Sequence, residues 1–358
     1  MAEIKLGPIS SKLLEPIEIR MKVMKEEIVD VNIKADYAQR NIEKLAQGRN
    51  VFNALYLIER VCGICSHAHT TPYCQSVEQI LDQAIPEKAK LTRVVVAELE
   101  RIQSHLLNLF EITHIIGEKN LAMKIFKIKE KVLNTLEIIG GNRVHYGVNI
   151  VGGVRSDINN ETKQKILRVM EDVKPQIKEC YGIIADVRRM KGIGILPKEV
   201  ARNVAVGPVA RASGINCDIR RDFPYAAYDE VGVDVKLRTE GDVMSRVCLR
   251  FEETLESVNI VKRALDLLPG HKDQFSELRD IVRGEAVSCV EAPRGANEYI
   301  IKLNEAGVIE KLEIKTPTQR NIHVLRDILL GQNVEDSEII LLSTDPCISC
   351  ACRYIYLK

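Results

Sequence analysis

The chain of 358 residues lacks a charge imbalance, a long apolar run and the cysteine density of a disulfide-stabilised protein. Its 51 basic and 50 acidic residues leave a formal net charge of +1, which argues against nucleic acid as a partner. No run of about 18 apolar residues occurs, and the first residues lack the apolar stretch of a secretory signal. We therefore expect a cytoplasmic chain that does not itself cross a membrane.

Ten cysteines are too few in a chain of this length for a disulfide scaffold, but four form two pairs of identical spacing, Cys62 with Cys65 and Cys347 with Cys350. A CxxC turn holds two sulfurs close enough to share one metal, and thiolates suit zinc, iron-sulfur clusters, copper(I) or nickel with iron. Zinc ribbons usually separate their pairs by about 15–20 residues, whereas most of this chain lies between the two pairs. The spacing predicts one metal site built by the whole fold, with a structural zinc site as the alternative.

Alternating apolar and polar residues predict short sheets near both ends of the chain. In the N-terminal region two alternating runs on either side of a turn at 25–27 predict a β-hairpin: Ile17, Ile19, Met21 and Val23, then Val29, Val31 and Ile33. The pattern returns on either side of a turn at 304–307, at Tyr299, Ile301 and Leu303, then Ile309, Leu312 and Ile314.

Between these regions apolar residues recur at steps of three and four, as in amphipathic helices. The clearest run is Leu121, Ile125, Ile128, Val132, Leu136 and Ile139. Further helices are expected over 87–116, 161–190 and 241–268, with a kink at Pro175, and the four could form a bundle. We expect an α+β, mainly α fold with a single domain over 1–358: a β-hairpin at 1–35, a mainly helical core at 36–285 and a C-terminal α+β segment at 286–358 that closes the metal site.

Both cysteine motifs resemble metal motifs of one enzyme family. The stretch from Arg60 to His69 (Arg-Val-Cys-Gly-Ile-Cys-Ser-His-Ala-His) is similar to the first metal motif of the nickel-iron hydrogenase large subunit, and that from Asp345 to Arg353 (Asp-Pro-Cys-Ile-Ser-Cys-Ala-Cys-Arg) is similar to its last. Other segments resemble stretches shared by membrane-bound, energy-converting (group 4, Ech-type) hydrogenases and the 49-kDa-type subunit of respiratory complex I, namely 98–106, 152–155, 207–214 and 218–225. The resemblance implies the hydrogenase large-subunit fold, a central bundle of long helices with small β elements near both termini.

The runner-up within this resemblance is the complex I subunit, which has lost the metal and binds quinone. A chain without nickel has no need of four thiolates at these positions, and all four are present. In addition, Gln39 stands where many relatives have the histidine of a His-Arg-Gly-x-Glu loop. The resemblance therefore implies a hydrogenase that cleaves H2 reversibly and reduces protons.

By this resemblance Cys62 and Cys347 would be terminal ligands of nickel, and Cys65 and Cys350 would bridge nickel to an iron carrying cyanide and carbon monoxide. A terminal thiolate can accept the proton when H2 is split heterolytically, which makes Cys347 a catalytic candidate. His69 would donate a hydrogen bond to the sulfur of Cys65 and so orient and tune the centre.

The segment Glu-Ala-Pro-Arg-Gly at 291–295 resembles the one that holds an arginine over the open metal position. Arg294 would offset the anionic ligands there and polarise bound hydrogen, with Pro293 also beside the centre. Asp345 could hold this arginine, and Ser343 could bond a cyanide.

Glu15 matches the glutamate that relays protons from the terminal cysteine, while its neighbour Glu18 is expected on a solvated strand face. In many relatives the last motif ends in a histidine that, with a glutamate of the upstream loop, binds magnesium. Arg353 stands at that position and cannot ligate a cation, but it could pair with Glu43, so no magnesium site is expected.

The remaining cysteines lack cluster spacing and offer no route for electrons, so a separate small iron-sulfur subunit is implied. The resemblance further implies ferredoxin as redox partner, additional iron-sulfur and integral membrane subunits that move protons or sodium, and a peripheral position on the cytoplasmic face of the membrane. Cys352 lies two residues after Cys350 and could be mistaken for a ligand. The others are expected to be buried: Cys74, Cys180, Cys217, Cys248 and Cys289.

Overall fold

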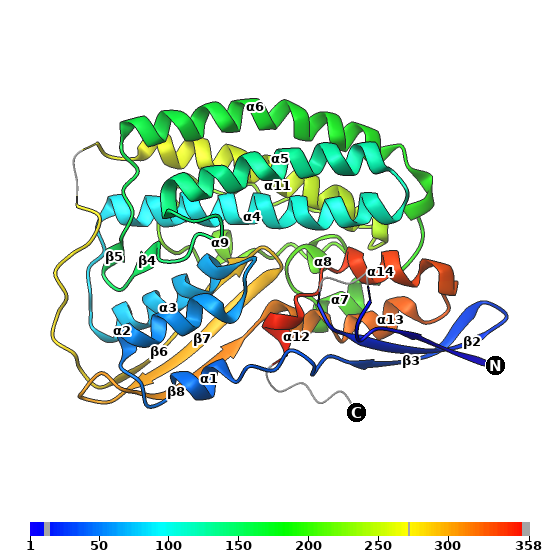
Figure 1. Ribbon diagram of the computed structural model, residues 1–358, viewed down its shortest axis with the longest axis horizontal. Helices are drawn as coiled ribbons and strands as arrows, with labels where there is room; N and C mark the ends of the chain where they lie inside the picture. The colour runs from blue at the N-terminus through cyan, green and yellow to red at the C-terminus, as the bar shows by residue number, and fades with distance from the viewer. Residues whose placement is uncertain (11–14, 271–272, 353–358) are drawn as a thin grey trace.

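The computed structural model describes residues 1–10, 15–270 and 273–352, and they form a mixed α+β architecture, as expected (Figure 1). In chain order the elements are β1 (Ala2–Leu6), β2 (Glu18–Met24), β3 (Glu27–Lys34), α1 (Ile42–Ala46), α2 (Val51–Ile58), η1 (Glu59–Val61), α3 (Ser66–Ile80), α4 (Glu87–Ile115), α5 (Lys119–Gly140), β4 (Asn149–Ile150), β5 (Gly153–Val154), α6 (Asn160–Ala185), η2 (Arg188–Met190), α7 (Lys198–Val204), α8 (Gly207–Arg211), α9 (Ile219–Asp222), α10 (Tyr228–Val231), α11 (Val243–Leu267), β6 (Gly284–Ala292), β7 (Gly295–Leu303), β8 (Ile309–Lys315), α12 (Pro317–Asn321), α13 (Val324–Leu329), η3 (Val334–Asp336), α14 (Ser337–Ser343) and α15 (Ile348–Ala351).

The four long helices α4, α5, α6 and α11 pack side by side, which confirms the predicted bundle (Figure 1). Their starts follow local chemistry, because the side chain of Asn159 accepts the Thr162 N–H at the start of α6 and Asp242 accepts the Ser245 N–H at the start of α11. Helix α5 ends where Gly141 takes a left-handed conformation. Pro175 lies inside α6, which is assigned as one helix from Asn160 to Ala185.

Helix α4 is the centre of the bundle and is buried on nearly every side. It contacts α5 and α11, and it also meets α3, α14 and β5. Its buried residues include charged ones such as Glu98, Glu100 and Arg101, which is stable only where each charge finds a partner. Helix α4 therefore contributes to the apolar core and also carries buried polar side chains.

The N-terminal hairpin is present as the antiparallel pair β2–β3, and β1 adds a third strand that the sequence pattern did not indicate. One face of β2 is buried through Ile19, Met21 and Val23, as the alternation predicted. The other face is not uniformly solvated. Glu18 is buried under Lys5, Arg20 and Tyr37, so the expectation of a solvated Glu18 is wrong.

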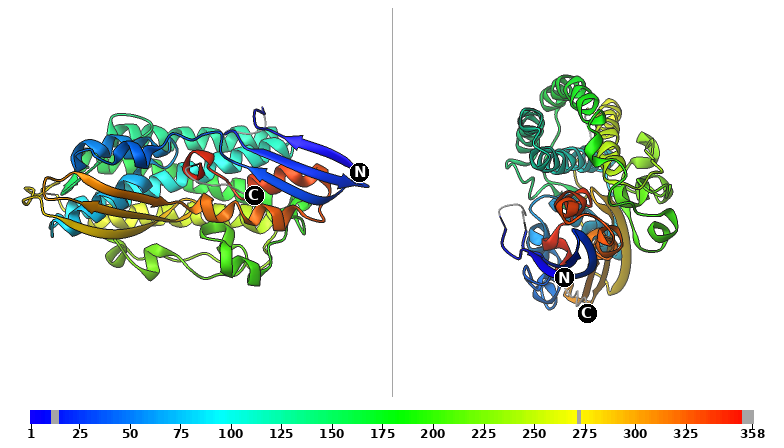
Figure 2. Two further views of the ribbon diagram at one scale, coloured as in Figure 1. Left: turned by 90° about the horizontal axis from the view of Figure 1, so that it is seen from below. Right: turned by 90° about the vertical axis from the view of Figure 1, so that its right-hand side faces the viewer.

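The C-terminal sheet contains the predicted strands β7 and β8 together with β6, which was not predicted. Helix α3 packs on this sheet, and the C-terminal sheet and the N-terminal sheet lie toward opposite ends of the molecule (Figure 2). The red C-terminal segment lies between them, close to the blue N-terminal segment that leads into α3 (Figures 1 and 2). None of the helices in the described ranges combines the length and apolarity needed to span a membrane.

Candidate metal centre

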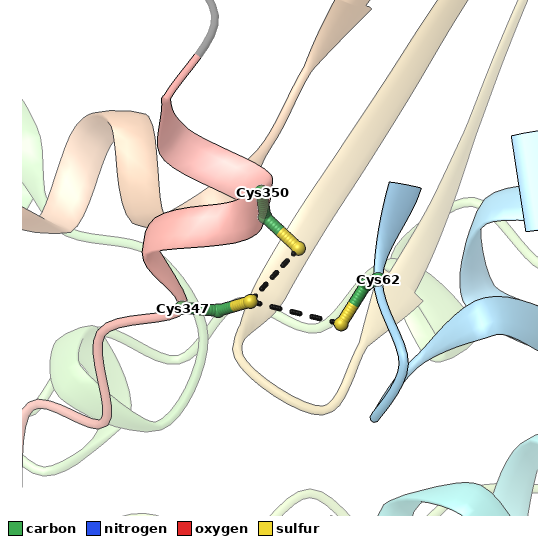
Figure 3. A group of neighbouring side chains, drawn as sticks. All are labelled: Cys62, Cys347 and Cys350. Atoms are coloured by element: carbon green, nitrogen blue, oxygen red, sulfur yellow. Dashed lines mark hydrogen bonds between the residues drawn. The ribbon is translucent and has the colours of Figure 1, made fainter. Parts of the chain in front are cut away.

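The two CxxC turns meet although they lie near opposite ends of the chain. Cys62 follows η1 and Cys65 precedes α3, while Cys347 precedes α15 and Cys350 lies within it. The Sγ–Sγ distance is 3.6 Å between Cys62 and Cys347, 3.9 Å between Cys65 and Cys350 and 3.1 Å between Cys347 and Cys350. Figure 3 shows the sulfurs of Cys62, Cys347 and Cys350 pointing toward one another.

The 3.6 Å separation fits two thiolates on one metal, and the 3.1 Å and 3.9 Å separations lie just outside the range for such a pair. Two sulfurs each ~2.3 Å from one metal lie roughly 3.3–3.8 Å apart for angles between 90° and tetrahedral. All four sulfurs are buried, and no solvent can stabilise several negative charges there. The centre therefore has the donor set and the spacing for one or two soft cations.

The electrostatics of the four thiols lead to the same conclusion. Hydrogen bonds from Cys347, Cys350 and Cys65 lower the pKa of Cys62 well below its ordinary value. Interaction with Cys350 and Cys62, together with burial, raises the pKa of Cys347 well above it. One thiolate therefore suppresses the ionisation of its neighbours, and a bound cation is needed to hold all four as thiolates.

His69 supports the second pair of sulfurs from α3. Its Nε2 lies 3.4 Å from the Sγ of Cys350, and its Nδ1 lies 2.8 Å from the hydroxyl of Tyr299 on β7. A hydroxyl that donates to Nδ1 leaves the ring proton on Nε2, which then donates to sulfur. The structure shows this contact with Cys350, and the expected hydrogen bond to Cys65 stays a prediction. Ligand atoms of Cys65, His69 and Cys350 also lie within 4.8 Å of one another, a set that would suit zinc.

Arg294 occupies the two-residue turn between β6 and β7, where Ala292 pairs with Gly295. Its guanidinium donates to the backbone O of Asp345 (2.8 Å), to Asp345 Oδ1 (2.7 Å) and to Ser104 Oγ (3.2 Å). Although burial alone would lower it, Asp345 and the nearby cysteines hold the pKa of Arg294 above its ordinary value. A fixed cation therefore lies near the sulfurs.

Gly207 explains how close the arginine turn can approach the start of α8. At φ +64° its backbone conformation suits glycine, and a Cβ there would lie 2.4 Å from the carbonyl oxygen of Arg294. Pro293, on the same turn, lines a separate small cavity together with His67 and Ala68.

Ser343 does not have the geometry expected for bonding a cyanide. Its hydroxyl accepts from Arg246 Nε at 2.9 Å and donates to the carbonyl of Ile340 at 2.6 Å. Because a hydroxyl has a single hydrogen, none remains for an acceptor at the metal. Ser343 instead joins α14 to α11.

Glu15 lies against the second cysteine turn. Its carboxylate accepts the backbone N–H groups of Ile348 and Ser349 and the Ser349 hydroxyl. The same carboxylate lines a cavity of about 40 Å³ with Arg294 and Asp345. The cavity is further lined by Ile17, Ile64, Asn108, Glu111, Leu341, Leu342, Pro346 and Ile348.

Family models and known proteins match most of this chain. The family model "Nickel-dependent hydrogenase" matches residues 40–115, and the model "Respiratory-chain NADH dehydrogenase, 49 Kd subunit" matches residues 116–281 and 270–353. A carbon monoxide-induced hydrogenase of Rhodospirillum rubrum is 34% identical over 98% of this chain and 99% of its own length. The chain belongs to the family of nickel-iron hydrogenase large subunits and complex I 49-kDa subunits.

Two further matches extend over nearly the whole chain. The membrane-bound hydrogenase subunit alpha of Pyrococcus furiosus is 33% identical over 99% of this chain and 88% of its own length. A chain in the structure of the membrane-bound sulfane sulfur reductase, an archaeal respiratory membrane complex, superposes with a TM-score of 0.93 at 24% identity and covers 98% of both chains. This member of the hydrogenase and 49-kDa family therefore shares its fold with a subunit of a membrane complex.

Several residues that support the centre were missed by the sequence analysis, although their segments were noted as similar to this family. Arg101 on α4 donates to the backbone carbonyls of Glu291 and Ala292. Arg211 bridges Glu253 and the side chain of Glu291, with 2.7 Å to each. Both arginines thus fix the strand end that carries Arg294. The sequence signal that could have identified them was an arginine among apolar residues of a helix.

Three other expectations concern the edge of the centre. Cys352 accepts the Ala38 N–H at 3.2 Å and belongs to no cluster of possible ligands within the described ranges. Cys217 is exposed, so its expected burial is wrong. Glu43 is buried and accepts the Ile314 N–H at 2.8 Å, whereas its expected partner Arg353 lies outside the described residues.

Proposed function

We propose that this chain is the catalytic large subunit of an energy-converting nickel-iron hydrogenase, folded as one unit over 1–358 with the hydrogenase large-subunit fold. The observation that carries the proposal is the convergence of four buried cysteine sulfurs beside a fixed arginine, a carboxylate and a cavity. Cys62, Cys65, Cys347 and Cys350 would hold nickel and an iron with cyanide and carbon monoxide. When bound, that group supplies Lewis acidity and redox capacity for reversible heterolytic cleavage of H2.

The chain's own residues then manage charge and protons. Arg294, held by Asp345, supplies positive charge next to anionic ligands and excludes bulk water from that side. Sγ of Cys347 is the proposed acceptor of the proton released from H2. Glu15 contacts the backbone directly after Cys347, which suits it to hold the next proton on a carboxylate oxygen. His69 orients and tunes the Cys350 sulfur.

A cavity lined by residues next to the cysteine motifs favours this proposal over a structural zinc site. Structural zinc is closed in by its ligands, whereas a catalytic centre keeps an accessible position. Here Glu15 and Arg294, which both lie close to the sulfurs, line a cavity of about 40 Å³. That volume holds a few water-sized molecules, so H2 would fit.

The proposed setting is a membrane complex. By analogy with relatives described as membrane-bound hydrogenases, electrons would pass to and from ferredoxin through a small iron-sulfur subunit. Further iron-sulfur subunits and an ion-translocating membrane arm would complete the complex on the cytoplasmic face of the membrane. Magnesium is not proposed, because Arg353 replaces the expected histidine.

The second candidate is a metal-free, quinone-binding subunit of a complex I-like oxidoreductase. The match of the 49-kDa model to residues 116–281 and 270–353 favours it. However, four thiols packed at 3.1–3.9 Å without metal would be an oxidation-prone cluster with no role in quinone binding.

Anaerobic purification of the intact complex separates the three possibilities. About one nickel per copy of this chain, with infrared bands of cyanide and carbon monoxide and exchange of deuterium from D2 into water, would support the hydrogenase. Stoichiometric zinc without those bands would support a structural site. Absence of nickel, of zinc and of those infrared bands, together with binding of a quinone analogue, would support the second candidate.

A further inference from the structure

A carboxyl group without a role in the proposed chemistry faces the same cavity as Glu15. Glu111 lies near the C-terminal end of α4, is partly exposed to solvent, and lines the cavity with Asn108, Arg294 and Asp345. Within the described ranges its carboxylate makes no hydrogen bond or ion pair. Glu15, in contrast, is held by three donors of the second cysteine turn.

Two acceptors on the cavity wall lack a donor. Asn108 Oδ1 and Asp345 Oδ2 are buried and have no hydrogen-bond partner within the described residues. A buried acceptor without a donor is costly, so the cavity favours groups that carry hydrogen. Water in a cavity of about 40 Å³ and a protonated carboxyl are such groups.

The surroundings of Glu111 also favour its protonated form. The charged groups that face Glu111 are Asp345, Arg294 and Glu15. Burial is the main cause that raises the pKa of Glu111 to about 8, with Asp345 and Glu15 adding to it and Arg294 opposing it. At neutral pH the carboxyl therefore carries a proton and can lose it near the working pH.

We propose that Glu111 is a second proton carrier, which exchanges protons between the cavity beside the cysteine centre and the solvent at the end of α4. The step balances without electrons, because one carboxyl proton leaves to water on the outer side and one proton arrives from the cavity side. The inference rests on the proposed function and extends it by one residue beyond Glu15.

The first experiment needs no metal. Infrared titration of the full-length, metal-free chain from pH ~6 to ~10 should show a protonated carboxyl band that disappears near pH 8. Glu111→Gln should lack that band. Glu137→Gln, a matched control on the exposed side of α5, should retain it. Persistence of the band in Glu111→Gln would assign it to another group and overturn the inference.

The second experiment uses the purified complex. Glu111→Gln should retain the cyanide and carbon monoxide bands but slow exchange of deuterium from D2 into water by about tenfold or more, with loss of the inflection near pH 8. Glu111→Asp should restore part of the rate, and Glu137→Gln should leave it unchanged. An unaltered rate and pH profile in Glu111→Gln would refute the role. Absence of nickel from the unmutated complex would instead refute the proposed function, while the titration would still report on Glu111.

Discussion

Arg211 offers a quantitative test of how the arginine turn is held. Its side chain is fully buried and lies 2.7 Å from both Glu253 and Glu291, whose side chains are 2% exposed. Replacing it with methionine keeps the length but removes the cation. Glu253 would keep His105, at 3.1 Å, whereas Glu291 would lose its one ion-pair partner within the described ranges.

The expected cost of Arg211→Met is about 3–5 kcal/mol of unfolding free energy, typical of breaking a buried ion pair from one side. The cost should depend on pH through Glu291. Burial raises the pKa of Glu291 above 4.5 even with Arg211 present, and loss of the cation raises it further. A carboxyl with a raised pKa binds more protons in the folded state, so its stability contribution is complete below pH 4.5 and is lost as pH rises through the folded-state pKa. The mutation should therefore cost less near pH 5 than near pH 8.

Urea unfolding of the metal-free chain at both pH values measures this difference. Arg279→Met is the control, because Arg279 pairs with Asp82 on the surface with side chains 54% and 93% exposed, and its loss should cost under about 1 kcal/mol. A second variant, Arg211→Met with Glu291→Gln, should recover part of the stability because no uncompensated charge remains on the strand end. An Arg211→Met cost as small as that of the control, or one that does not vary with pH, would refute the reasoning.

Three further substitutions test the centre itself. Cys347→Ser should abolish H2 turnover and lower the nickel content of the complex, measured by elemental analysis, because a hydroxyl is a poor ligand for soft metals. Cys352→Ser should retain nickel and cost about 1 kcal/mol in urea unfolding, since its sulfur accepts the Ala38 N–H; loss of nickel would make it a ligand. Glu15→Gln should keep the cyanide and carbon monoxide bands but slow deuterium exchange into water, and a normal rate would remove Glu15 from the proton path.

Local patterns in the sequence predicted much of the framework. The step of three and four from Leu121 to Ile139 gave α5, and the alternation from Tyr299 to Leu303 gave β7. Strand β6 was not predicted because its buried positions do not alternate regularly. The strand packs on α3, and Arg101 donates hydrogen bonds to the carbonyls at its end. The burial of Glu18 was not predicted for a similar reason, because the side chains that bury it, Lys5 and Tyr37, lie on other segments.

The candidate centre was predicted in its donors but less well in its contacts. Spacing within each CxxC pair identified four cysteines, because neighbouring thiols in one turn are a local property. The partner of His69 and the hydrogen bonds of Ser343 depend on how α15, α14 and α11 dock, which no local pattern specifies. Glu111 was also missed, since a glutamate near the end of a long helix resembles any surface residue until the cavity beside it is known.

The short helix α15 shows why the centre depends on the whole chain. Four residues are too few for a helix to be stable alone, so α15 needs external contacts. Its backbone receives them from distant segments: Glu15 accepts two of its N–H groups, Thr318 accepts the N–H of Cys347, Thr316 donates to the carbonyl of Cys350, and Arg40 donates to the carbonyl of Ser349. These hydrogen bonds add to the apolar burial of Ile348 and Ala351 and fix the direction of α15 as well as its position. The second cysteine pair is therefore aimed at the first only after the N-terminal region and the segment after β8 have docked, which couples formation of the thiolate cluster to completion of the fold.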